Sequence, residues 1–188
     1  NYTIRKITHP PLYFNGVQLQ ESMSHKHLGV ILQKNCTWHQ HIDQMCGKAS
    51  RTVGVLRGLM YKLDRKTLEI IHISHIRPLL EYADILWDPH LEFLSEKLEN
   101  IQLAAARAVT GAIRGTSHEL IYRETGWETL KSRRKQHRLS MMYKIIGDIS
   151  PSFLKDLLPP TFGELTARET RYVSDLQTYR ANTTTFHE

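Results

Sequence analysis

Cysteine is scarce in this sequence, with Cys36 and Cys46 the two examples in 188 residues. Two thiols make no disulfide framework, and they do not supply the four ligands of a structural zinc site. Such cysteine usage is typical of a reducing compartment, so we expect an intracellular protein, nuclear or cytoplasmic. No apolar run approaches the roughly 20 residues that span a bilayer, so no membrane partner is expected.

The sequence also lacks the short motifs of common enzymes. It contains no phosphate-binding loop, no dinucleotide fingerprint and no Ser, His and Asp grouping. His39 and His41 form one histidine pair and His72 and His75 another, but neither has cysteine or carboxylate placed nearby to complete a zinc site. We interpret these histidines as surface or packing residues, and we expect no cofactor in this chain.

Positive charge is the main compositional feature that is present. Lysine and arginine total 25 against 19 acidic residues, giving a net charge of +6 and a pI of about 9.4. This balance fits nucleic acid, although a mildly basic globular surface has the same balance. Residues 81–99 hold six acids and one base, whereas residues 101–150 hold nine bases and four acids. We expect this asymmetry to orient a polyanion along one side of the protein.

The hydrophobic pattern predicts a mainly α protein, a helical bundle with a small N-terminal antiparallel β element. Residues 12–14 and 17–19 flank Asn15-Gly16, a strong hairpin signal because both turn residues tolerate positive φ. Residues 27–32 predict a third strand. Three short strands cannot bury a face alone, so they need a helical body to pack on.

From residue 39 the apolar residues recur with a helical period. The predicted helices cover residues 39–60, 66–87, 91–113, 116–124, 129–146 and 151–158. Pro78 lies inside the second helix and removes a backbone hydrogen bond, so we expect a kink or a split there. Beyond residue 161 the polar, threonine-rich composition predicts a tail.

Glu81-Tyr82-Ala83-Asp84 resembles part of the metal-binding turn of reverse transcriptases. That chemistry needs paired carboxylates on a strand–turn–strand. Here Ile85 stands where the second acid would be, and the surrounding period is helical. We therefore interpret Asp84 as a solvated acid and Tyr82 as a surface or packing residue.

The sharpest electrostatic feature is the basic run over residues 131–138. On a helix, four of its bases fall within an arc of about 100°, and Met141, Met142 and Ile145 occupy the same arc two turns later. We therefore expect the first half of this helix to project from the core and the second half to dock. Positive charge at a helix N-terminus is unfavourable, and a bound polyanion would offset it; a solvated helix end is the alternative.

The bases that we predict to contact nucleic acid lie on the first, third and basic helices. They are Lys48, Arg51, Arg107, Arg114, Lys131, Arg133, Arg134, Lys135 and Arg138. Such contacts neutralise phosphates and do not read bases.

Several short segments follow one another along the chain: Phe-Asn-Gly at 14–16, Lys-His-Leu-Gly-Val at 26–30, Trp-His-Gln-His-Ile at 38–42, Ile-Arg-Pro-Leu-Leu-Glu-Tyr-Ala at 76–83, Leu-Trp-Asp-Pro at 86–89, Leu-Glu-Asn-Ile-Gln at 98–102, Gly-Trp at 126–127 and Leu-Leu-Pro at 157–159. In this order they resemble the region after the catalytic motifs in LINE-type, jockey-like non-LTR retrotransposon reverse transcriptases.

This resemblance implies a division into four parts. They are the last palm strands at 1–37, a thumb-like helical bundle at 38–115, a C-terminal helical extension with the basic helix at 116–160, and a polar tail at 161–188. His27, Leu28, Gly29 and Val30 would form a primer-grip-like strand that steadies the growing DNA end.

By the same resemblance, the catalytic carboxylates would precede this region. The chain would then be an inactive fragment of an RNA-directed DNA polymerase, and both of its ends look cut. Its partners would be RNA and DNA, as template–primer duplex, and the remainder of the polymerase, with Mg²⁺ expected only in the intact enzyme. Two alternatives stay open: a helical protein-interaction module from a domesticated or decayed element, and a metal-dependent enzyme that uses Asp84.

Overall fold

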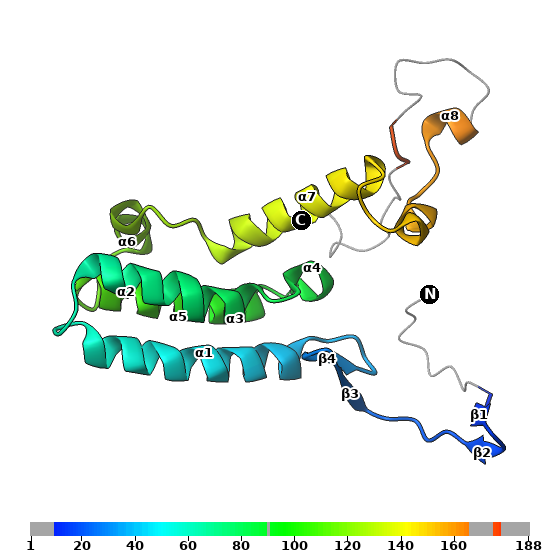
Figure 1. Cartoon of the computed structure of the whole chain (residues 1–188), viewed down its shortest axis with the longest axis horizontal. Helices are drawn as coiled ribbons and strands as arrows, with labels where there is room; N and C mark the ends of the chain where they lie inside the picture. Colours follow the sequence, from blue (N-terminus) through cyan, green and yellow to red (C-terminus); the bar gives the residue numbers. More distant parts are fainter. Residues whose placement is uncertain (1–9, 90, 166–174, 178–188) are drawn as a thin grey trace. The chain divides into compact units, whose positions relative to one another are not determined.

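The computed structural model describes residues 10–89, 91–165 and 175–177, and the described part is mainly α with a small N-terminal β element, as predicted (Figure 1). The chain divides into two compact units, Asn1–His41 and Ile42–Glu188. The first unit holds all the described strands, and the second holds nearly all the helices. No helix in the described ranges is both long and apolar enough to span a membrane.

The N-terminal unit contains two separate antiparallel hairpins. Strands β1 (Tyr13–Phe14) and β2 (Val17–Gln18) are joined by Asn15-Gly16, whose φ angles of 48° and 79° are those of a tight hairpin turn. The predicted hairpin at this position is therefore confirmed. All four strand residues are exposed.

The second hairpin corrects the prediction of one strand over residues 27–32. Strands β3 (Ser24–His27) and β4 (Val30–Gln33) pair antiparallel, with His27 opposite Val30. Leu28 and Gly29 form the turn between them, with φ angles of 45° and 88°. Leu28 continued the apolar strand pattern in the sequence, but Gly29 readily adopts positive φ and allows the reversal. The primer-grip-like residues thus span a turn, and only His27 and Val30 lie in strands.

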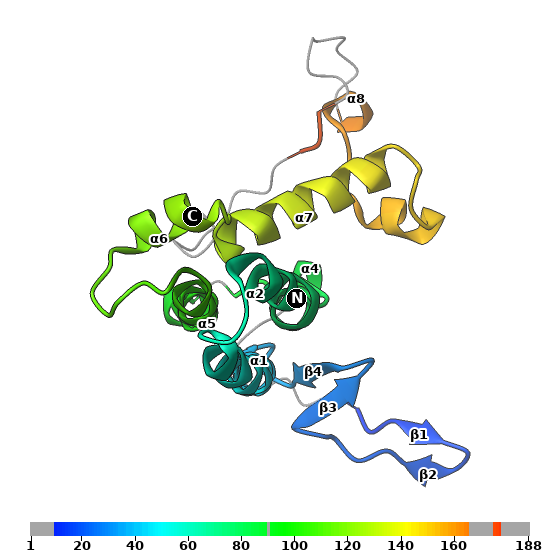
Figure 2. The same cartoon turned by 60° about the vertical axis from the view of Figure 1, so that its left-hand side comes forward.

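The helical unit is built around α1 (His39–Leu59) and α5 (Glu92–Thr110). Figures 1 and 2 show these helices side by side with α2 (Arg65–Ile71). The predicted apolar stripe of α1 is buried at Ile42, Met45, Cys46, Ala49, Val53 and Leu56. On the surface, the Lys97 ammonium donates to Asp43 Oδ1 at 2.6 Å and links the two helices.

The predicted helix over residues 66–87 is broken twice. After α2, a π-helical turn η1 (His72–Ile76) leads into α3 (Arg77–Glu81), and Pro78 lies in the first turn of α3, where its missing N–H costs little. The second break precedes α4 (Asp84–Trp87), at Ala83 with φ of 54°. The Trp87 indole N–H donates to the Tyr82 carbonyl at 2.7 Å across this break. Alanine favours helices, so the sequence did not indicate a helix break at Ala83.

Helices α6 (His118–Thr125) and α7 (Leu130–Ile146) pack on the central helices, α6 on α5 and α7 on α3, α4 and α5. Helix α6 begins at the Ser117 cap, and α7 begins at the Thr129 cap. A 3₁₀ helix η2 (Ser152–Leu157) contacts α7, and α8 (Phe162–Leu165) follows. Helix α8 lies within residues 161–188, where we predicted a polar tail. Most of the remaining predicted tail lies outside the described residues.

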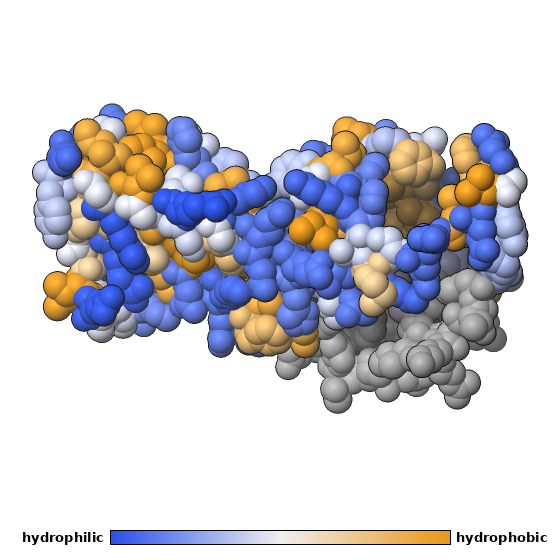
Figure 3. Space-filling model, turned by 90° about the horizontal axis from the view of Figure 1, so that it is seen from below, coloured by the Kyte–Doolittle hydropathy of each residue, from blue (hydrophilic) through white to orange (hydrophobic). Residues whose placement is uncertain are grey.

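Not all apolar side chains are buried by this packing. Hydrophobic residues reach the surface in several patches between hydrophilic ones on the face shown in Figure 3. In the helical unit, the second half of α7 is the clearest case, with Leu139, Tyr143 and Ile146 all exposed. The packing of the helical unit therefore does not bury the apolar face of this half of α7.

His72 in the π-helical turn is a buried packing residue. Its ring stacks on Trp127, with 3.7 Å between ring centroids and 11° between planes. Within the described residues, neither ring nitrogen has a hydrogen-bond partner. Burial, together with the nearby Arg77 and Arg133 guanidinium groups, lowers the pKa of His72 to about 3. His72 is therefore neutral in the folded protein near neutral pH.

Acid is expected to destabilise the helical unit through His72. Its pKa is lower in the folded state than the ordinary 6.5, so the stability that depends on the neutral ring is complete above pH 6.5 and is lost as pH falls toward 3. Near pH 4.5 this loss is about 2–3 kcal/mol. In His72→Phe, the difference in unfolding free energy between neutral and acid pH should shrink by that amount, as measured by denaturant titration with tryptophan fluorescence.

The exposed neighbour His75 provides the control. His75→Phe should keep the acid sensitivity of the parent protein. The same pH dependence in His72→Phe and the parent would contradict this account of His72.

Candidate nucleic-acid interface

The outer face of α1 combines three glycines with basic side chains. At 100° per residue, Gly47, Gly54 and Gly58 fall within an arc of about 40°, roughly opposite the buried stripe. Arg51 lies about 20° from this arc and Lys48 about 80° from it, both on the same side. We call these five residues the α1 outer face.

The internal packing of the protein does not require these glycines. A Cβ atom added at Gly47, Gly54 or Gly58 would meet no atom within 4 Å. Glycine inside a helix destabilises it by about 1 kcal/mol relative to alanine. A helix face without side chains does allow another backbone to approach closely. Our sequence analysis missed this face, although the spacing of the glycines on a predicted helix was a readable signal.

Four of the nine predicted contact residues are available to a ligand. Lys48, Arg51, Arg114 and Lys135 are exposed, and none of them forms an ion pair within the described part of the chain. Arg107, in the last turn of α5, is half-buried, and its Nε is buried without a hydrogen-bond partner.

The basic half of α7 docks on the protein, contrary to the expectation that it projects. Arg134 is 2% exposed. Its Nε donates to Asp88 Oδ1 at 2.7 Å, and its Nη2 donates to Ser95 Oγ at 2.7 Å. Leu130, one turn earlier, is also buried. The arginine therefore packs into the unit with its charge compensated, and the acidic segment supplies the compensation.

Other bases of α7 pair with the same acidic segment. Arg133 donates to both carboxylate oxygens of Glu81, and this bonding raises the pKa of Arg133. Arg138 Nη1 lies 2.6 Å from Asp88 Oδ2. Lys131 Nζ lies 3.3 Å from Glu92 Oε2. The acidic and basic segments therefore neutralise each other across the packed helices, whereas we expected them to form opposite sides of a polyanion site.

Asp84 is buried, which corrects its interpretation as a solvated acid. His137 Nδ1 lies 2.6 Å from Asp84 Oδ2, and the Asp84 side chain is 4% exposed. Burial raises the pKa of Asp84, and the His137 contact acts in the opposite direction. Tyr82 is exposed, in line with its predicted surface position. Across the described ranges, no group of three or more His, Cys, Asp or Glu side chains is placed to hold a metal ion.

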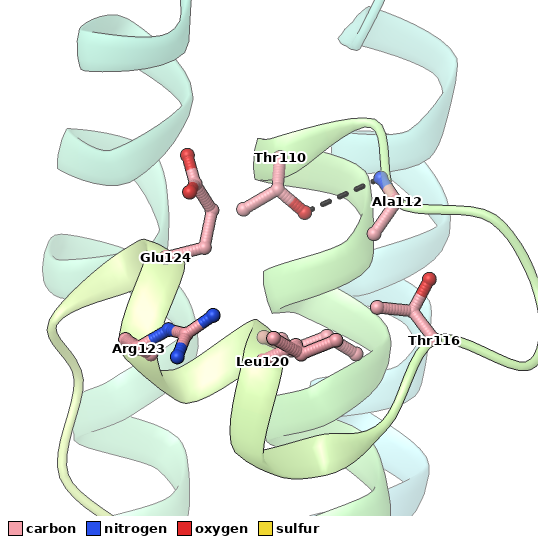
Figure 4. Close-up of a pocket in the computed structure, with 7 residues that line it drawn as sticks. Thr110, Ala112, Thr116, Leu120, Arg123 and Glu124 are labelled. Atoms are coloured by element: carbon pink, nitrogen blue, oxygen red, sulfur yellow. Dashed lines mark hydrogen bonds between the residues drawn. The ribbon is translucent and has the colours of Figure 1, made fainter.

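A small open pocket lies between the end of α5 and helix α6, with a volume of about 250 Å³ (Figure 4). The Thr110 hydroxyl already accepts from the Ala112 N–H and donates to the Ala106 carbonyl. Glu124, which also lines the pocket, pairs with Arg65. Arg123 is the one basic residue of the lining, and a single basic group is too little to direct chemistry.

The chain is similar to two Drosophila melanogaster proteins. "Probable RNA-directed DNA polymerase from transposon BS" is 23% identical over 133 residues, covering 68% of this chain and 14% of the relative. "Probable RNA-directed DNA polymerase from transposon X-element" is 21% identical over 139 residues, covering 72% of this chain and 15% of the relative. The chain thus spans about a seventh of the length of these relatives. No protein-family model and no solved structure matches the chain.

Arg134 and Lys135 are adjacent in sequence, but their substitution should have very different effects on stability. Arg134→Met is expected to lower the unfolding free energy by about 3 kcal/mol, because Ser95 and Asp88 lose a buried charged partner. Lys135→Met removes an exposed cation and should change the unfolding free energy by less than about 0.5 kcal/mol. Urea unfolding of the two variants measures the difference, and equal losses would refute the buried position of Arg134.

Proposed function

We propose that this chain is the region after the catalytic centre of a LINE-type, jockey-like non-LTR retrotransposon reverse transcriptase, and that it holds template–primer nucleic acid without joining nucleotides. The α1 outer face carries the proposal, because three glycines lie there with two bases that form no ion pair among the described residues. The distant similarity to two transposon polymerases supports the identity of the parent protein.

In this proposal the α1 outer face contacts the sugar–phosphate backbone. The glycines allow a strand to lie close to the helix, while Lys48 and Arg51 neutralise phosphates along one side of it. Such contacts fix the position of a duplex without reading its sequence. This suits a polymerase, which must hold every sequence that it copies.

The structure changes the roles that we assign to the other bases. Arg114 and Lys135 are proposed as further phosphate contacts because they are exposed and unpaired among the described residues. Arg133, Arg134 and Arg138 are proposed to hold α7 in place through Glu81 and Asp88.

The assignment of residues 38–115 to a thumb and of the β3–β4 hairpin to a primer grip belongs to the same proposal. The exposed turn residue Leu28 would then face the primer. The remainder of the polymerase is the second proposed partner. Mg²⁺ would act in the catalytic part of the intact enzyme. The proposed place of action is the nucleus or the cytoplasm, where such nucleic acids occur.

A helical protein-interaction module remains the second candidate function. The observation that favours it is the exposed apolar half of α7, since large exposed apolar patches mark protein contacts. Binding to heparin and to a duplex at two salt concentrations separates the candidates. Absence of binding to both at low salt would favour the interaction module.

Replacing the glycines should stabilise the protein and weaken its binding. The double variant Gly54→Ala with Gly58→Ala is expected to gain about 1–2 kcal/mol of unfolding free energy, because alanine is the better helix former and its methyl groups meet nothing. The same methyl groups would hold a strand away from the helix, so affinity for an RNA–DNA hybrid should fall about tenfold, a loss near 1.4 kcal/mol. Fluorescence anisotropy at fixed salt measures the affinity.

Ser140→Ala is the control for this experiment. This substitution also introduces alanine, at an exposed position of α7, and leaves the α1 outer face unchanged. Affinity should therefore not change. Unchanged affinity in the glycine double variant would exclude close approach of a strand to α1.

Removing the two α1 bases should reduce the salt dependence of binding. For Lys48→Gln with Arg51→Gln, the slope of log affinity against log salt should become shallower by about 2, because two phosphate neutralisations are lost. The reduction should be the same for unrelated sequences. Lys144→Gln, on the far half of α7, should keep the parent slope, and a double variant that also kept it would remove these two bases from the interface.

A further inference from the structure

The second half of α7 exposes a continuous apolar stripe. Leu139, Met142, Tyr143 and Ile146 recur at three- and four-residue spacing, so they share one helix face. Their exposed fractions lie between 38% and 72%. The ion pairs that hold α7 end one residue earlier, at Arg138. We call these four residues the apolar stripe.

The size of the apolar stripe matches one side of a protein interface. At roughly 200 Å² for a fully exposed large apolar side chain, the exposed fractions correspond to about 450 Å² of apolar surface. A standard interface covers about 800 Å² on each partner, of which a little over half is apolar. The apolar stripe therefore supplies the apolar content of such an interface, with a polar rim still to be added.

We propose that the apolar stripe binds the same stripe of a second copy of this chain, with the two α7 helices antiparallel. A two-fold axis passing between Met142 and Tyr143 sets Leu139 of each copy opposite Ile146 of the other. This pairs side chains of similar volume, and the same patch serves both copies, as a two-fold interface requires. The proposal goes beyond nucleic-acid binding and does not depend on it.

The charges at the two ends of the apolar stripe are already paired within the chain. Arg138 precedes the stripe and pairs with Asp88, while Asp148 follows it and pairs with Lys155. A second copy that covers the stripe therefore meets no uncompensated charge at Arg138 or Asp148. Nucleic acid fits the stripe poorly, because none of its four side chains is basic.

Sedimentation equilibrium of the 188-residue protein tests this proposal. The apparent mass should rise with concentration from 21.9 kDa toward twice that value. Leu139→Lys and Ile146→Glu, each alone, should weaken self-association at least about tenfold, because each buries a charge against an apolar side chain. Mixing the two variants should restore association, because the introduced ammonium then faces the introduced carboxylate while the second contact keeps its apolar pair.

Lys144→Glu is the matched control, since it reverses a charge on the same exposed half of α7 but outside the stripe; it should leave the association unchanged. Circular dichroism should show the parent helicity in every variant. A monomer at all concentrations, association that both stripe variants leave unchanged, or mixed variants that fail to associate would each overturn the proposal. The measurements contain no nucleic acid, so their failure leaves the proposed function standing.

Discussion

The contact of Arg134 with Asp88 and Ser95 fixes how α7 lies on the helical unit. Since the arginine is buried, its guanidinium needs these partners, and rotation or displacement of α7 would leave a charge without them. Glu81 and Asp84 receive further basic side chains from the same half of the helix. This set of contacts decides which half of α7 packs and which half faces water.

Two different surfaces follow from this arrangement. The bases that hold α7 are engaged within the unit. Phosphate contacts are therefore proposed for bases without an ion pair in the described ranges, among them Lys48 and Arg51 on α1. The second half of α7, beyond its ion pairs, presents Leu139, Tyr143 and Ile146 to water. A basic face with glycines suits a charged backbone, whereas an apolar stripe suits another protein surface.

The sequence predicted local features well and long-range pairing poorly. The α1 stripe and the Asn15-Gly16 turn follow from periodicity and turn chemistry, which act over a few residues. The Leu28-Gly29 turn was missed because leucine fits a strand pattern. The orientation of α7 was predicted wrongly because its basic and apolar halves occupy the same helical arc. Which half of α7 packs depends on where residues 81–99 lie in space. The residue spacing along α7 does not show where those residues lie.

In α1, one face stabilises the fold and the opposite face, which carries the glycines, is proposed to bind. About 3 kcal/mol of helix stability is lost at three glycines. The opposite face offsets this loss, because burial of a side chain such as Ile42 or Leu56 stabilises the fold by about 1.5–3 kcal/mol each. Tertiary packing thus sustains α1 whatever its outer residues are. The residues of the outer face are therefore not needed for folding. They can instead match the shape and charge of a ligand that binds there.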